Sequence, residues 1–194
     1  MDIINNFIIW RGFSYIKEMK LRKFNFYIVL VIFLFIFVTL LLGLNKNNTY
    51  TTEQIVDKKI INFESIDLIT EKKISFFNIL GDEKYTILNI WASWCLPCKS
   101  EHGHLIEIKK NTNSNLIGIN YKDKNVKAKS FLRELGNPYH YSIVDNNGLI
   151  SIDLGAYGVP ETYIIENKSR KIIKKYIGPL DKENLKEIIK LLEL

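Results

Sequence analysis

Residues 85–98 read YTILNIWASWCLPC, a short apolar run that leads directly into a pair of cysteines. Residues 85–90 have the length and composition of a buried strand, and the residues after the cysteines, as far as Lys110, have a helical pattern. The stretch therefore predicts a strand, a loop and a helix, with Cys95 at the start of the helix. Pro97 fits the first turn of that helix, where a missing N–H costs little.

Cys95 and Cys98 are the two cysteines of the chain. A disulfide that spans two intervening residues restricts the unfolded chain little, so stability is a poor reason for it. At a helix N-terminus, unpaired N–H groups and the positive end of the dipole favour thiolate, the nucleophile of disulfide exchange. We therefore expect Cys95 to be the nucleophile and Cys98 to resolve the mixed disulfide.

The alternative interpretation of the cysteines is a metal site, because His102 and His104 follow them closely. A structural zinc site usually draws its second pair of ligands from a distant segment, and histidines two positions apart project from different sides of a helix. We therefore expect a redox-active Cys95–Cys98 disulfide with no metal and no other cofactor. His140 is isolated in the sequence and is expected to lie at or near the surface.

The pattern after the cysteine helix alternates strands and helices. Residues 115–120 read as a strand and residues 126–135 as a helix, so a parallel sheet is predicted. Residues 162–166 and 171–177 read as two strands joined by a turn short enough for an antiparallel hairpin. A last helix begins after Asp181, which is expected to be its N-cap. This order of elements is that of a thioredoxin-like α/β fold.

Residues 24–44 form an uncharged stretch, FNFYIVLVIFLFIFVTLLLGL. As a helix it would be roughly 31 Å long, which matches a bilayer core of about 30 Å. A cleaved signal peptide is the alternative, but it would have a shorter apolar region and end at small residues, which residues 40–46 do not offer. Basic residues cluster just before the stretch, so the positive-inside rule places the N-terminus in the cytoplasm.

The predicted organisation has four parts: a cytoplasmic segment over residues 1–23, a transmembrane anchor over 24–44, a tether over 45–58 and a periplasmic domain over 59–194. A chain of 194 residues allows one ordinary domain with an appendage. Its net charge of +6 is shared evenly between residues 1–23 and the rest, so nucleic acid is not expected as a partner.

Two sequence motifs, WASWCLPCKSEH at residues 91–102 and GVPET at 158–162, resemble the membrane-anchored thiol:disulfide interchange proteins of cytochrome c maturation. This is the DsbE or CcmG family. The similarity continues through residues 118–123, 135–139, 153–157 and 177–180. The resemblance implies a periplasmic thioredoxin-like fold with a reducing dithiol, which delivers electrons to the C-x-x-C-H motif of apocytochrome c.

The resemblance also implies roles for individual residues. Besides Cys95 and Cys98, it places these residues at the site: Trp94, Pro97, Glu101, Val159, Pro160 and Glu161. Pro160 is implied to be cis, although an ordinary trans proline is the prior, since only about 5–6% of X-Pro bonds are cis. Glu101 and Glu161 are implied to be acidic residues near the site, and we expect their negative charges to raise the pKa of Cys95. A solvated residue at a strand end is the alternative for Glu161.

Two neighbours of these residues have interpretations of their own. Trp91 is expected in the core, in contrast to the site-flanking Trp94. Gly103 stands where many relatives of the wider fold have a helix-kinking proline, which leaves the path of that helix open.

The predicted partners are apocytochrome c or its assembly proteins and a membrane electron donor that acts by thiol transfer, because the chain has no flavin or nicotinamide fingerprint. A general periplasmic dithiol reductase, a dithiol oxidant and a non-catalytic apocytochrome or haem chaperone are the alternatives. The predicted location is the bacterial inner membrane, crossed once. Residues 139–157 are expected to be a central insertion in the fold, with Tyr141 and Tyr157 as aromatic walls of a client groove.

Overall fold

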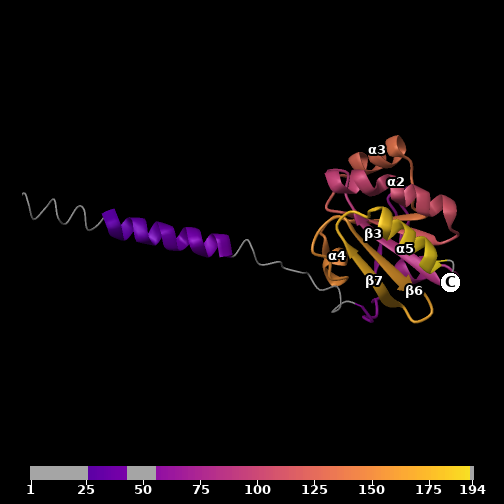
Figure 1. The fold of residues 1–194 in the computed structure, drawn as a ribbon. Helices are drawn as coiled ribbons and strands as arrows, with labels where there is room; N and C mark the ends of the chain where they lie inside the picture. Colours follow the sequence, from indigo (N-terminus) through magenta and orange to yellow (C-terminus); the bar gives the residue numbers. More distant parts are fainter. Residues whose placement is uncertain (1–25, 43–55, 193–194) are drawn as a thin grey trace, which may run out of the picture. The chain divides into compact units, whose positions relative to one another are not determined.

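The computed structural model describes residues 26–42 and 56–192 (Figure 1). The chain divides into two compact units, residues 1–50 and 51–194. In the first unit, residues 26–42 form a helix with exposed side chains. Among the described residues, no helix has both the length and the apolar character needed to cross a membrane. The ends of the predicted anchor, the segment before it and residues 45–55 of the predicted tether lie outside the described residues.

A five-stranded mixed sheet with the order β5-β4-β3-β6-β7 is the centre of the second unit. Its strands are β3 (Tyr85–Trp91), β4 (Asn115–Tyr121), β5 (Tyr141–Asp145), β6 (Glu161–Glu166) and β7 (Lys171–Ile177). β3, β4 and β5 are parallel, whereas β6 is antiparallel to both β3 and β7. The predicted parallel sheet and the predicted hairpin are therefore confirmed.

Three longer helices cover one face of this sheet (Figure 1): α2 (Leu96–Asn111), α3 (Asn125–Leu135) and α5 (Lys182–Leu192). α2 continues through Gly103 without a break. α5 begins after Asp181, whose Oδ1 accepts hydrogen bonds from the amides of Glu183 and Asn184 (2.9 and 2.8 Å), as an N-cap does.

The other face of the sheet is covered by shorter elements that the sequence pattern did not reveal. They are the 3-10 helix η2 (Phe76–Ile79) and α4 (Leu149–Asp153), together with Ile74 of β2 (Lys73–Ser75). β1 (Glu64–Ile66), which forms a hairpin with β2, runs instead beside the edge strand β5, where Asp67 bridges to Ile143. Phe76 and Leu154 bring these elements into a core that includes Leu88 and Tyr163 of the sheet. Two separate apolar cores thus lie on the two faces.

The predicted insertion over residues 139–157 contributes β5, an edge strand of the main sheet, and α4. Tyr141 is the first residue of β5, at the amino end of the parallel strands. Cys95 follows the carboxyl end of β3, so Tyr141 and Cys95 lie at opposite ends of the parallel strands. The predicted place of Tyr141 in a groove beside the cysteines is therefore wrong. Tyr157 lies immediately before the GVPET loop.

Candidate active site

Cys95 and Cys98 are joined in a disulfide with an S–S distance of 2.06 Å. Cys95 is the N-cap residue of α2, and its Sγ accepts a hydrogen bond from the amide of Cys98 at 3.1 Å. Pro97 is in the first turn of the same helix. Both sulfurs therefore belong to the first helical turn, where free N–H groups stabilise a thiolate.

The loop that carries Cys95 is held from the neighbouring strand. The Asp123 carboxylate, which follows β4, accepts hydrogen bonds from the Ser93 amide (2.5 Å) and the Ser93 hydroxyl (2.8 Å). The Trp94 indole N–H donates to the carbonyl of Lys122 at 3.1 Å, while 58% of the Trp94 surface stays exposed. Trp94 thus flanks the disulfide on the outside of the molecule.

Trp91 occupies the core, as expected from the sequence. Only 1% of its surface is exposed, and its ring stacks on Tyr139 with a centroid distance of 5.6 Å. The side chain packs between β3 and the helical layer, where it also meets Phe131 of α3.

Glu101 lies one helical turn after Cys98 and is buried, with 1% of its surface exposed. Its carboxylate accepts hydrogen bonds from the Asn89 side-chain amide (2.9 Å) and the Leu180 backbone amide (2.8 Å). The oxygen of the Asn89 side chain in turn accepts from the Tyr139 hydroxyl at 2.7 Å. The described part of the chain provides no cation that pairs with Glu101.

Burial raises the pKa of Glu101 to about 7, because removal from water disfavours the charged carboxylate. The hydrogen bonds from Leu180 and Asn89 favour the carboxylate and limit the rise. At neutral pH the group therefore exchanges a proton readily. Such a group one turn from Cys98 can accept or return a proton during thiol chemistry.

The Val159–Pro160 peptide bond is cis. Ile90 near the end of β3 pairs with Glu161 at the start of β6, so the loop before β6 lies beside the loop that carries Cys95. The Pro160 carbonyl accepts a hydrogen bond from the amide of Gly178 at 3.0 Å. The sheet register thus brings together the two motifs that carried the resemblance.

Glu161 is not solvated: 1% of its surface is exposed and its Oε2 pairs with the Lys175 ammonium at 2.9 Å. Thr162, the next residue of β6, bonds to Asn89 on the face covered by α2. Because successive side chains of a strand alternate, Glu161 belongs to the other face. The structure therefore places Glu101 and Glu161 on opposite faces of the sheet.

His102 and His104, the two histidines considered as metal ligands, are hydrogen-bonded to different backbone carbonyls. A ring nitrogen of His102 lies 2.8 Å from the Gly136 carbonyl oxygen, and one of His104 lies 2.9 Å from that of Leu180. Burial lowers the pKa of His102. Across residues 26–42 and 56–192, no group of three or more metal-ligating side chains converges on a common point. His140 is exposed, with one ring nitrogen accepting from the Leu116 amide.

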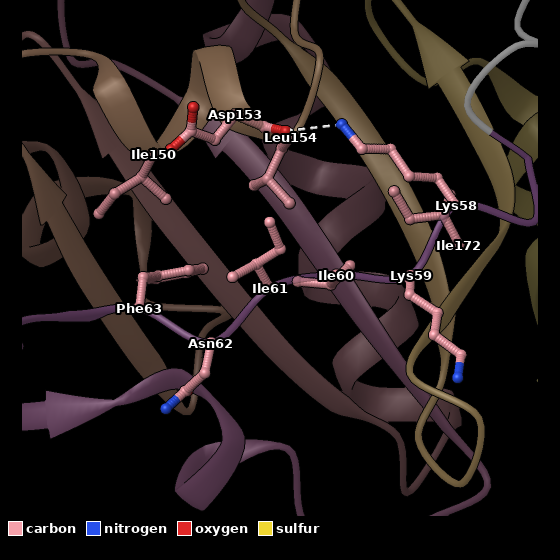
Figure 2. A pocket seen from close by; sticks show the side chains of 10 residues that line it. All are labelled: Lys58, Lys59, Ile60, Ile61, Asn62, Phe63, Ile150, Asp153, Leu154 and Ile172. Atoms are coloured by element: carbon pink, nitrogen blue, oxygen red, sulfur yellow. Dashed lines mark hydrogen bonds between the residues drawn. The ribbon is translucent and has the colours of Figure 1, made fainter.

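A small cavity of about 80 Å³ lies elsewhere in the domain and shares no residue with this site (Figure 2). It is bordered by residues 58–63, by α4 and the residue after it, and by Ile172 of β7. Lys58 reaches across to the backbone carbonyl of Asp153 at 2.9 Å. The cavity lies between residues 58–63 and α4, and none of the residues that line it is among those predicted at the active site.

Sequence reasoning missed four residues that build the site: Asn89, Asp123, Tyr139 and Lys175. Asn89 carried a signal, since it interrupts the otherwise apolar run of β3, and a buried amide requires partners. The other three are recognisable only once the strands are paired.

A dithiol at a helix N-terminus, beside a cis-proline loop on a mixed sheet, defines a thioredoxin-like thiol–disulfide oxidoreductase. Comparison with known proteins agrees with this class, since residues 70–191 match the Redoxin family. The chain is 38% identical over 136 residues to thiol:disulfide interchange protein DsbE of Vibrio cholerae serotype O1, covering 70% of this chain and 72% of that protein. It therefore belongs to the DsbE, or CcmG, family of thiol:disulfide interchange proteins.

Other relatives match over shorter stretches. The chain is 46% identical over 104 residues to thiol:disulfide interchange protein CycY of Rhizobium leguminosarum bv. viciae, covering 54% of this chain and 55% of that protein. It is 40% identical over 114 residues to DsbE of Escherichia coli K12, with 58% of this chain and 60% of that protein covered. The matched part thus spans just over half the length of these two relatives.

Among solved structures, a DsbF homologue from Corynebacterium diphtheriae has a TM-score of 0.61 at 22% identity, covering 76% of this chain and 95% of that one. StoA from Bacillus subtilis has a TM-score of 0.52 at 25% identity, covering 66% and 95%. The likeness to the DsbF homologue concerns the fold alone.

Proposed function

We propose that this protein is a membrane-anchored periplasmic reductase that opens the disulfide of the C-x-x-C-H haem-binding motif in apocytochrome c. The observation that carries the proposal is the Cys95–Cys98 disulfide at the start of α2, beside the cis-proline loop, in a member of the DsbE family. The structure describes the oxidised form, which is the product of client reduction.

In the proposed reaction, the Cys95 thiolate of the reduced protein attacks one sulfur of the client disulfide. A mixed disulfide forms, and the other client sulfur leaves as a thiolate that takes up a proton. Cys98, after losing its own proton, then attacks the Cys95 sulfur and releases the second client thiolate. This thiolate is protonated in turn, so the client gains two electrons and two protons. The protons are those of Cys98 and the one that Cys95 released to solvent when its thiolate formed, and the protein ends with the Cys95–Cys98 disulfide.

We assign Glu101 as the group that accepts the proton of the Cys98 thiol. It lies one turn further along α2, it is buried, and its pKa of about 7 lets it accept a proton at neutral pH. Its negative charge also disfavours a stable thiolate at the dithiol. A less stable reduced form makes a better electron donor, so we expect a reduction potential nearer to thioredoxin's roughly −270 mV than to DsbA's roughly −120 mV.

The remaining features of the proposal concern location and supply. Residues 24–44 act as the anchor, with residues 1–23 in the cytoplasm and the domain after residue 45 in the periplasm. Electrons arrive from a membrane protein by a second thiol exchange at the same disulfide. A dithiol without a nicotinamide or flavin fingerprint needs such a donor.

Enzymatic assay of three proteins tests the proposal: the wild type, Cys95→Ser and Cys98→Ser. The reduced wild type is expected to reduce an oxidised C-x-x-C-H peptide much faster than it reduces oxidised glutathione, and both variants are expected to lose turnover. Equal rates on the two disulfides would favour a general reductase. The double variant Cys95→Ser/Cys98→Ser has no dithiol. If cells that carry it still mature cytochrome c, the chaperone alternative is favoured.

A further inference from the structure

The buried ion pair between Glu161 and Lys175 connects β6 to β7 on the face of the sheet away from α2. Exposed fractions of the two side chains are 1% and 0%. Lys175 stands opposite Tyr163 in the antiparallel pairing, and Glu161 is two residues before Tyr163 on the same face. The Tyr163 hydroxyl donates to Glu161 Oε2 at 2.6 Å, so that this oxygen serves both partners.

Both members of the pair also bind the backbone of the segment that leads into the cis-proline. Lys175 Nζ donates to the Gly155 carbonyl at 2.9 Å. Glu161 Oε1 accepts from the amides of Tyr157 (2.8 Å) and Gly158 (3.3 Å). One ion pair therefore fixes three backbone groups within four consecutive residues, directly before the Val159–Pro160 bond.

The same ammonium group lies 4.3 Å from the centre of the Tyr157 ring, in cation–π geometry. Tyr157 is 56% exposed, and it immediately precedes the loop that lies beside Cys95. Lys175 thus contacts the Tyr157 ring, and more than half of the Tyr157 surface remains accessible to a bound polypeptide.

We propose that Lys175 is a positioning residue for client binding. With Glu161 it holds residues 155–158 and the Tyr157 ring in the conformation that receives the client polypeptide beside the disulfide. The inference rests on the proposed function for the identity of the client. Lys175 touches neither the sulfurs nor Glu101 in any described contact, so it acts through the loop and leaves the thiol chemistry alone.

Three substitutions in the full chain, purified in detergent, test this role. Lys175→Met removes the charge and the donors at similar length, and Lys175→Arg keeps both. Lys174→Met is the matched control, because Lys174 is the adjacent residue of β7 and pairs with Glu187 of α5 instead. Each protein is assayed for KM and kcat with an oxidised C-x-x-C-H peptide, and for its reduction potential against glutathione.

Lys175→Met is expected to raise KM for the peptide by about tenfold, which corresponds to about 1.4 kcal/mol of binding, the scale of one lost hydrogen bond. The reduction potential should stay at the wild-type value. Lys175→Arg keeps the charge and the donors in a bulkier side chain, so it should raise KM less than Lys175→Met does. Lys174→Met should match wild type. An unchanged KM in Lys175→Met, or a changed potential, would overturn the positioning role.

The double variant Glu161→Gln/Lys175→Met covers the case in which Lys175→Met does not fold, because it buries no uncompensated charge. It still lacks the bond to Gly155 and the ammonium under Tyr157, so its KM is expected to remain raised. A wild-type KM in this variant would mean that Lys175 only neutralises Glu161, which overturns the proposal.

Hydrogen exchange at the Tyr157 and Gly158 amides provides a readout that needs no client. Exchange at these amides is expected to be at least about tenfold faster in the double variant than in wild type, since the loop opens locally. Unchanged exchange would overturn the inference even if the wild type proved inactive on the peptide. Inactivity of the wild type on the peptide, with faster exchange in the variant, would instead contradict the proposed function.

Discussion

Glu101→Gln is the substitution for which the structure gives the most definite expectation. In the folded protein the pKa of Glu101 is raised from its ordinary value of 4.5 to about 7, chiefly by burial. At about 1.36 kcal/mol for each pH unit between these two values, the ionised carboxylate costs the folded state about 3 kcal/mol. Gln has nearly the same shape, keeps an oxygen acceptor and carries no charge.

The sign of the pH dependence follows from the raised value. Because the folded state holds the Glu101 proton more tightly than the unfolded state does, the stabilisation is complete below pH 4.5 and is lost as the pH rises through about 7. Glu101→Gln removes this loss. The free energy of unfolding of the variant, minus that of wild type, is therefore expected to increase by about 3 kcal/mol between pH 4.5 and pH 8.

Urea unfolding of the oxidised proteins at a series of pH values measures this difference directly. Glu107→Gln is the control, since it makes the same substitution at an exposed position of the same helix. The constant effect of placing an amide beside Asn89 cancels, as only the change with pH is used. A flat difference for Glu101→Gln would refute the argument from burial.

Three further predictions concern the loop, the ion pair and the membrane. Asp123→Ala leaves the Ser93 amide and hydroxyl without their partner, so the free energy of unfolding should fall by about 1–3 kcal/mol; an unchanged urea midpoint would contradict this. Glu161→Gln leaves the buried Lys175 charge uncompensated and should cost about 3–5 kcal/mol, most of which returns when Lys175→Met is added; calorimetry that shows additive losses would count against a coupled pair. Protease added to spheroplasts should digest the domain and spare cytoplasmic markers, whereas a soluble periplasmic form that starts near residue 45 would indicate a cleaved signal peptide.

Long, regular patterns in the sequence predicted their elements well. The strand predicted over residues 85–90 extends by one residue to Trp91, and the helix predicted over 126–135 begins one residue earlier. The elements that were missed are short: β1 and β2 have three residues each, η2 has four, and β5 and α4 have five each. Segments of that length cannot display a periodicity, and their structure depends on partners distant in sequence.

The local part of the site was predictable for the same reason. Cys95, Pro97 and Cys98 share one helical turn, so their arrangement follows from the sequence alone. To place Glu161, one must know how β6 is paired with its neighbours and which face of the sheet the Glu161 side chain is on. No local sequence pattern gives this information. The pairing of β6 with β7 also has an irregularity at Ile164 and Ile165, which upsets the simple alternation that a sequence reading of β7 assumes.

The role predicted for Glu161 shows the consequence of not knowing the strand pairing. As an acidic residue beside a thiol it would tune the chemistry, but as the buried partner of Lys175 its charge is compensated and its oxygens serve the loop. Of the two acidic residues predicted near the site, Glu101 is the one that has no salt bridge to a described cation, and it lies on the same helix as Cys98. The electrostatic argument for a reducing dithiol therefore depends on Glu101.

Capture of the client on Cys95 tests the central claim most directly. The reduced Cys98→Ser variant is mixed with an oxidised C-x-x-C-H peptide and, separately, with a disulfide peptide of unrelated sequence. The masses of the products are then measured by mass spectrometry. The account predicts a mixed disulfide that accumulates preferentially with the C-x-x-C-H peptide, and none with Cys95→Ser/Cys98→Ser. Equal accumulation with both peptides, or no adduct with the C-x-x-C-H peptide, would contradict it.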